Sequence, residues 1–241
     1  MYVADEALCK DVAMANRIIE RFGLSSAFGH ASARVPGTDT FVLPTRRSPG
    51  LAKAENLLLL NLDGKLLAGD GQPNSEFWIH ARIYAARPDV GGVVHAHPPG
   101  CICLTQIGQP LKVLFNQAAA FRKGVPEYER IGLIRSRELG DLVAQKLGGG
   151  NALMMRGHGM AVALPDIRSA AVLACYLEES ASLQLRMLGA AGGDATKLRL
   201  YSDEDAAQVG GDNNASTLTR AWEYYAAAAE ALLLGHVKPG L

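Results

Sequence analysis

The 241-residue chain is poor in cysteine, with four such residues and no pair spaced C-x-x-C. Paired cysteines usually mark a structural zinc site or a redox motif, so the sequence argues against both. A chain of this length also buries enough surface to fold without cross-links. We therefore expect reduced thiols at Cys9, Cys101, Cys103 and Cys175, as is usual in a cytoplasmic protein.

Charge of one sign and long apolar runs are lacking as well. The 24 basic and 24 acidic residues cancel, so there is no excess charge to attract nucleic acid or an anionic membrane. No apolar stretch approaches the roughly 20 residues of a membrane span. Residues 1–23 lack the basic-then-apolar layout of a signal peptide and predict an amphipathic helix instead. We expect neither nucleic acid nor a membrane as a partner.

What the chain does contain is 49% hydrophobic residues, in segments that alternate between strand-like and helix-like patterns. This mixture predicts one α/β domain over residues 1–241. Asp63-Gly64 predicts a hairpin turn, and Asn74 or Ser75 can cap a helix that Glu76 opens. The other expected elements are helices at 137–150 (closed by its glycines), 165–193 and 217–235, and strands at 31–35, 40–44, 91–97 and 152–164, the last interrupted at residues 157–159.

Two histidines stand two residues apart in the stretch GGVVHAHPPG, at His95 and His97. Side chains two apart in a strand project from the same face. Two neutral imidazoles on one face suit a shared metal ion, although paired core histidines have the same spacing. His158, between two glycines in an apolar segment, would be costly to bury without a partner.

Glu76 and His80 are one helical turn apart and share a helix face. A carboxylate at Glu76 could bind an ion or move a proton. His80 could be a further ligand, or a helix histidine that packs or hydrogen-bonds near the site. We expect no role for His236. Three neutral histidines without a cysteine suit a divalent transition ion with an open coordination position, which is typical of a catalytic site.

The motifs PNSE, VVHAHPPG and RGHGMAV, in this order and followed by a long helix, resemble the class II aldolase/adducin family. That family includes sugar-phosphate aldolases, a 4-epimerase and aromatic-acid decarboxylases. The resemblance implies a three-layer α/β/α domain with a central, largely antiparallel sheet. It implies one divalent ion per subunit (zinc, manganese or iron) held by His95, His97 and His158, with Glu76 as catalytic acid/base.

The same resemblance implies a homotetramer, or another homo-oligomer, with active sites between subunits. A catalytic tyrosine of the family lies in a loop similar to VPEYERIGL, which indicates that Tyr128 acts in the neighbouring subunit's site. Adducin-like members without turnover lack the metal histidines, whereas this chain keeps all three. A purely structural role is therefore disfavoured.

The sequence departs from the sugar-phosphate members in the parts that bind substrate. Their G-N-[IV]-S turn is replaced by Gly29-His30-Ala31-Ser32, and Asn74 replaces the first of two serines before the glutamate. Two arginines also occur in LPTRRSPG. These features resemble the decarboxylase branch, because arginine suits a carboxylate and histidine can bond a phenolic oxygen or a carboxylate. The predicted substrate-binding residues are His30, Ser32, Arg46, Arg47, Asn74 and Ser75.

These observations predict a metal-dependent carbon–carbon lyase acting on a small carboxylate. The preferred reaction is decarboxylation of a hydroxylated aromatic or heteroaromatic (di)carboxylic acid, with the ion as Lewis acid and Glu76 moving the proton that replaces carbon dioxide. The alternative is an aldolase that cleaves a hydroxy acid or a sugar phosphate. Both reactions use the same metal residues, so only the substrate-binding segment separates them.

Overall fold

The computed structural model describes residues 5–211 and 215–233, so His236 and the end of the expected last helix lie outside the described residues. One eight-stranded sheet forms the centre, in the order β4-β3-β2-β1-β5-β8-β7-β6. Neighbouring strands are antiparallel, except for the parallel pair β6 and β7. The strands are β1 (His30–Arg34), β2 (Thr40–Pro44), β3 (Leu57–Asn61), β4 (Leu66–Ala68), β5 (Gly92–Ala96), β6 (Glu127–Tyr128), β7 (Ala152–Met155) and β8 (Gly159–Leu164).

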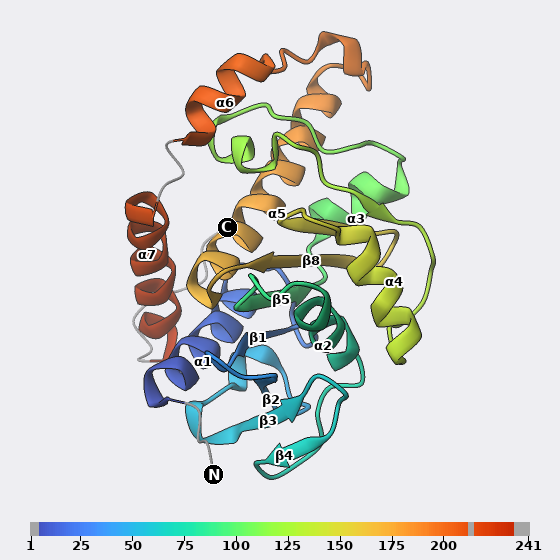
Figure 1. Cartoon of the computed structure of the whole chain (residues 1–241). Helices are drawn as coiled ribbons and strands as arrows, with labels where there is room; N and C mark the ends of the chain where they lie inside the picture. Colours follow the sequence, from blue (N-terminus) through green and yellow to red (C-terminus); the bar gives the residue numbers. More distant parts are fainter. Residues whose placement is uncertain (1–4, 212–214, 234–241) are drawn as a thin grey trace.

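Helices cover both faces of this sheet (Figure 1). One hydrophobic core lies between the sheet and the helices α1, α3, α5 and α7, and a second lies between the other face and α2 and α4. The three-layer α/β/α architecture with a largely antiparallel sheet is thereby confirmed. The helices are α1 (Glu6–Arg21), α2 (Phe77–Ala86), α3 (Pro99–Gln106), α4 (Arg137–Leu147), α5 (Ile167–Ala190), α6 (Asp203–Gly211) and α7 (Ala215–Leu233).

Alternation along the central strands decides which side chains face α2. In β5, Val93 belongs to the core on the α2 side, whereas Val94 and Ala96 belong to the core on the α5 side. His95 therefore projects toward α2, two residues after Val93. His30 of β1 is the direct partner of His95 in the β1–β5 ladder, so the two rings share that face, with centroids 5.2 Å apart.

The segment 152–164 differs from the expected interrupted strand. It forms the hairpin of β7 and β8, in which Met154 pairs with Met160. The chain reverses at residues 156–158, where Gly157 has a φ of 62°, a left-handed conformation that favours glycine. His158 consequently lies in a tight turn at the end of the sheet, beside the end of β5.

Within the described ranges, none of the helices combines the length and the apolar character that crossing a bilayer requires. The cysteines at positions 9, 101, 103 and 175 are all free.

Candidate active site

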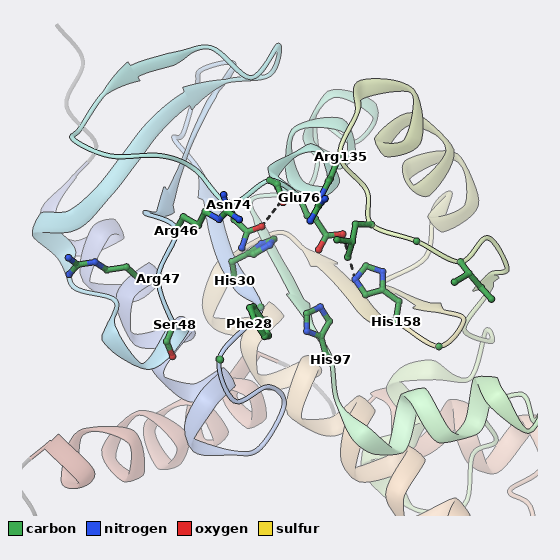
Figure 2. Close-up of a pocket in the computed structure, with 17 residues that line it drawn as sticks. Phe28, His30, Arg46, Arg47, Ser48, Asn74, Glu76, His97, Arg135 and His158 are labelled. Carbon is green, nitrogen blue, oxygen red and sulfur yellow. Dashed lines mark hydrogen bonds and ion pairs between the residues drawn. The ribbon is translucent and has the colours of Figure 1, made fainter.

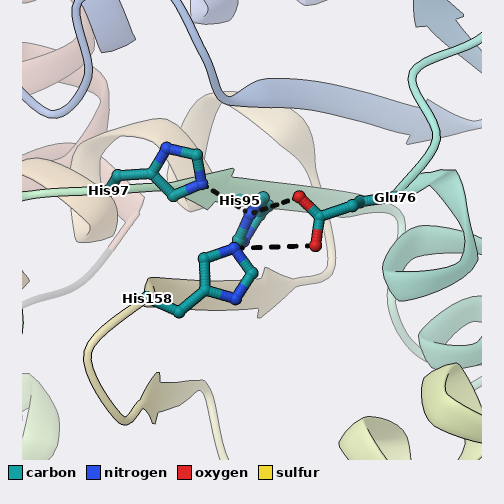
Figure 3. A group of neighbouring side chains, drawn as sticks. All are labelled: Glu76, His95, His97 and His158. Atoms are coloured by element: carbon teal, nitrogen blue, oxygen red, sulfur yellow. Dashed lines mark hydrogen bonds and ion pairs between the residues drawn. The ribbon is translucent and has the colours of Figure 1, made fainter. Parts of the chain in front are cut away.

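Four side chains converge at the ends of β5 and the β7–β8 hairpin: Glu76, His95, His97 and His158 (Figure 3). One potential ligand atom from each lies within 4.8 Å of all the others. The Nε2 atoms of His95 and His97 are 3.1 Å apart. Two ligands at tetrahedral positions about 2.1 Å from an ion are roughly 3.4 Å apart, so this spacing suits a shared metal.

The backbone explains why these rings meet. His95 is the last residue of β5 that faces α2, one position before the end of the strand. His97 lies just beyond the strand, where its N–H donates to Ser25 Oγ at 2.8 Å. Gly159 is needed beside them, because a Cβ there would lie 2.1 Å from the Ala96 carbonyl oxygen and 3.0 Å from the His97 ring. The glycine thus lets the hairpin bring His158 against β5.

Hydrogen bonding leaves the metal-facing nitrogens free. His95 Nδ1 is 2.8 Å from the Met160 carbonyl oxygen, which only accepts, so Nδ1 carries the proton and Nε2 keeps its lone pair. His158 Nε2 is buried and lies 3.5 Å from Glu76 Oε1 (Figure 3), but it has no hydrogen-bond partner in the described part of the chain. An orphaned buried nitrogen that faces two imidazoles and a carboxylate fits a missing metal ion.

The charge states of the site also suit a cation. Burial, and then the neighbouring imidazoles, hold the pKa of His95 well below its usual value. Burial and His158 lower the pKa of His97 to about 4. These two imidazoles are therefore neutral near pH 7, the form that binds metal. Burial alone would raise the pKa of Glu76, but the approach of His158 and His95 and a backbone N–H lower it to about 2. Glu76 is therefore an ionised carboxylate.

Glu76 is held from two sides. It is the residue before α2, yet its side chain makes no capping bond to that helix. Its Oε1 instead accepts the Ile134 N–H at 2.8 Å. The N-cap position is occupied by Glu76 and not by the predicted Asn74 or Ser75. The Glu76 N–H donates to Asn74 Oδ1 at 3.0 Å, which forms an Asx turn ahead of the helix. The carboxylate therefore faces the histidines.

A cavity of about 750 Å³ opens over this cluster (Figure 2). Three of the four clustered side chains line the cavity: Glu76, His97 and His158. Arg46 extends toward Asn74, whereas Arg47 extends away from the histidines (Figure 2). The predicted substrate-binding residues that line the cavity are His30, Arg46, Arg47, Asn74 and Ser75.

Two predicted residues lie elsewhere. Ser32 is fully buried and hydrogen-bonded to His80 and Tyr84, so the expectation of direct substrate contact needs correction. Tyr128 is 6% exposed, packs in the core on the α2 side, and does not line the cavity. Its place in β6, paired with β7, points the ring into that core. Tyr128 therefore lies outside the cavity of its own chain, and its role in a neighbouring subunit's site stays a prediction.

One residue of the site, Arg135, was not predicted, whereas one of the two expectations for His80 is confirmed. Arg135 lines the cavity beside Glu76 (Figure 2), in the loop whose Ile134 N–H binds Glu76. Nothing in the local sequence marks this arginine, because a long-range backbone contact brings it there. His80 is not one of the four clustered side chains. It is buried and hydrogen-bonded to His30, which agrees with the expectation of a helix histidine that hydrogen-bonds near the site. Burial lowers the pKa of His80 to about 3.

Known proteins of similar sequence are enzymes that break carbon–carbon bonds. The 3,4-dihydroxyphthalate decarboxylase of Arthrobacter keyseri is 30% identical over 229 residues, covering 87% of this chain and 90% of that protein. An L-fuculose phosphate aldolase of Methanococcus maripaludis is 27% identical over 161 residues, covering 66% of this chain and 85% of the aldolase.

Solved structures share the fold. An aldolase II superfamily protein from Pseudomonas syringae superimposes with a TM-score of 0.83 at 22% identity, over 96% of this chain and 95% of that one. The L-fuculose 1-phosphate aldolase from Glaciozyma antarctica superimposes with a TM-score of 0.79 at 21% identity, over 96% of this chain and 91% of that one. The model of the Class II Aldolase and Adducin N-terminal domain matches residues 10–185. This chain belongs to the class II aldolase and adducin family.

Proposed function

We propose that the protein is a divalent-metal-dependent carbon–carbon lyase that decarboxylates a hydroxylated aromatic or heteroaromatic carboxylic acid bearing a second carboxylate. The observation that carries the proposal is the charge of the cavity. Arg46, Arg47 and Arg135 line it, and none of their guanidinium groups has a hydrogen bond or ion pair within residues 5–211 and 215–233. Free guanidinium groups suit carboxylates, which they bind in a bidentate manner.

The residues next to these arginines suit a metal ion. His95, His97 and His158 would hold the ion, with Glu76 as a fourth ligand or as a nearby base. Zinc and manganese both accept such a set of ligands, and iron does too. When bound, the ion supplies Lewis-acid stabilisation of the negative charge that develops as a carbon–carbon bond breaks.

Glu76 would move the proton of the reaction. As an ionised carboxylate it first accepts a proton, which an acidic substrate hydroxyl can provide. The bond to the departing carboxylate breaks and leaves its electron pair on carbon as carbon dioxide is released. The proton on Glu76 then joins that carbon. The Ile134 N–H keeps the carboxylate oriented throughout.

The curated relatives support this choice. Three of them are named 3,4-dihydroxyphthalate decarboxylase, at 28–30% identity over 80–87% of this chain. The aldolase alternative is supported by the L-fuculose phosphate aldolase, whose match is shorter. A direct comparison separates the two: the metal-loaded protein is given 3,4-dihydroxyphthalate and, separately, fuculose 1-phosphate. Release of carbon dioxide from the first supports the proposal, and cleavage of the second alone assigns the protein to the aldolases.

We also propose a cytoplasmic homo-oligomer. Three apolar side chains at the rim of the cavity are exposed to solvent in the single chain: Phe28 at 68%, Ile131 at 76% and Leu133 at 43%. Apolar groups gathered at one rim are typical of a surface that another subunit covers. A homotetramer would suit this arrangement, and the free cysteines suit a reducing compartment.

A further inference from the structure

A chain of buried hydrogen bonds leads from the cavity wall into the interface between the sheet and α2. His30 Nδ1 lies 2.6 Å from His80 Nε2, and His80 Nδ1 lies 2.6 Å from Ser32 Oγ. Ser32 Oγ lies 2.8 Å from the Tyr84 hydroxyl oxygen. All four side chains are at most 2% exposed, so water does not compete for these bonds. We call His30, His80, Ser32 and Tyr84 the buried relay.

The inner end of the buried relay fixes the direction of its bonds. The Tyr84 hydroxyl donates to the Ser32 carbonyl oxygen at 2.9 Å, and a carbonyl can only accept. A hydroxyl has one hydrogen, so the Tyr84 oxygen must accept from Ser32 Oγ–H. Ser32 Oγ then accepts from His80 Nδ1–H. It follows that His80 Nε2 is unprotonated and accepts from His30 Nδ1–H.

The end of the buried relay that lies at the cavity is consistent with the same direction of hydrogen bonding. Asn74 Oδ1 accepts the Glu76 N–H at 3.0 Å, which leaves the amide NH₂ group of Asn74 to donate. Asn74 lies beside His30 in the wall of the cavity (Figure 2). Because Nδ1 of His30 donates to His80, Nε2 is the ring nitrogen that keeps a lone pair toward the cavity. His30 is not in the clustered metal-site group, so this lone pair is not committed to an ion.

We propose that Tyr84, Ser32 and His80 are positioning residues that hold His30 as a hydrogen-bond acceptor, and that His30 receives a hydroxyl group of the substrate. A lone pair attracts an O–H group but repels a carboxylate oxygen, which has no hydrogen to give. The hydroxyl would therefore face His30 and the carboxylate would face the arginines. The part that concerns the substrate rests on the proposed function; the assignment of the ring protons does not.

A spectrum of the histidine nitrogens tests the assignment without any substrate. The zinc-loaded protein, labelled with ¹⁵N-histidine, is recorded by long-range ¹H–¹⁵N correlation, which distinguishes protonated from unprotonated ring nitrogens. His30→Asn and His80→Asn variants identify the two sets of signals. We expect a protonated Nδ1 and an unprotonated Nε2 in both rings. A protonated Nε2 in His30 would overturn the proposal, whatever reaction the enzyme performs.

The variant Tyr84→Phe tests the positioning role. Without the phenol oxygen, Ser32 Oγ–H can turn to His80 Nδ1, so the donor order reverses and His30 Nε2 becomes protonated. Binding of 2-hydroxybenzoate and of benzoate to the zinc-loaded protein is measured by calorimetry. We expect the preference for the hydroxylated ligand to fall by roughly 3- to 10-fold, the usual range for one hydrogen bond.

Tyr176→Phe is the matched control, because it removes the same hydroxyl from a buried tyrosine of α5 outside the buried relay. Its preference for 2-hydroxybenzoate should equal that of the wild type. An unchanged preference in Tyr84→Phe, together with unchanged histidine nitrogens, would contradict the positioning role. If Tyr84→Phe does not fold, the wild-type spectrum still decides the assignment of the protons.

Discussion

Glu76 combines a fixed position with an ionised carboxylate, and this combination suits proton transfer. Glu76→Gln keeps an oxygen for the Ile134 N–H, so the fold should persist. The amide cannot carry the proton of the reaction, and turnover should fall by about 10²- to 10⁴-fold. Steady-state rates and a thermal unfolding curve provide the measurements. A variant with a near wild-type rate would exclude Glu76 as the acid/base.

The two neighbouring arginines Arg46 and Arg47 allow a paired test of substrate binding. Arg46 extends toward Asn74 and Arg47 extends away from the histidines (Figure 2). We predict that Arg46→Ala raises the KM for a hydroxylated carboxylate by about tenfold, since it removes a charge-assisted hydrogen bond. Arg46→Lys should not restore the KM, because an ammonium group lacks the planar fork of arginine.

Arg47→Ala is the comparison and should raise the KM less than Arg46→Ala does, because Arg47 extends away from the histidines (Figure 2). Equal effects of Arg46→Ala and Arg47→Ala would show that the two side chains bind substrate together. The absence of any kinetic effect in both variants would remove this segment from substrate binding and leave Arg135 as the remaining candidate.

At the scale of elements, the β7–β8 hairpin must pass very close to β5. A methyl group at position 159 would overlap the Ala96 carbonyl oxygen, which is backbone and cannot turn aside. We predict that Gly159→Ala costs about 1–3 kcal/mol of unfolding free energy. It should also weaken metal binding, because Ala96 stands between His95 and His97.

Gly149→Ala is the matched control for this prediction. Gly149 follows α4, has no positive φ, and an added Cβ there would meet nothing within 4 Å. Urea unfolding and metal titration of both variants give the comparison. Wild-type stability and metal affinity in Gly159→Ala would contradict the close packing of hairpin and strand.

Local patterns in the sequence predicted most elements but not the contacts between them. The strand at 40–44 matches β2, and the Asp63-Gly64 turn joins β3 and β4. The prediction of one interrupted strand at 152–164 is wrong, because the segment forms the β7–β8 hairpin. Apolar residues continue on both sides of the turn, and the positive φ of Gly157 is what allows the reversal. The helices α3 and α6 were not predicted, because both are short and depend on tertiary contacts more than on a clear apolar period.

The candidate site was predicted only in part, because local sequence patterns do not show which distant residues come into contact. The H-x-H spacing and the isolated His158 indicated the metal ligands from local sequence alone. Arg135 depends on a loop held by a backbone bond to Glu76, which leaves no local signal. The buried relay did leave one: His30 and Ser32 share a strand face, and His80 and Tyr84 share a helix face. Their meeting depends on packing α2 against β1.

At the scale of the whole molecule, we predict that the active protein is a homo-oligomer. The exposed side chains Phe28, Ile131 and Leu133 lie at the mouth of the cavity, so a second subunit that covers them would also help to close the site. Light scattering during size-exclusion chromatography gives the mass, and activity is measured across the same peak. A fully active monomer would contradict the prediction.

The central claim is that this chain uses a bound divalent metal to release carbon dioxide from a hydroxylated aromatic dicarboxylate. The most direct measurement is carbon dioxide release from 3,4-dihydroxyphthalate by three samples: metal-stripped protein, the same protein reloaded with zinc or manganese, and metal-supplied His95→Ala. We predict turnover in the reloaded wild type alone, with one ion bound per chain. An undiminished rate in stripped protein, or in a His95→Ala variant without bound metal, would contradict the account.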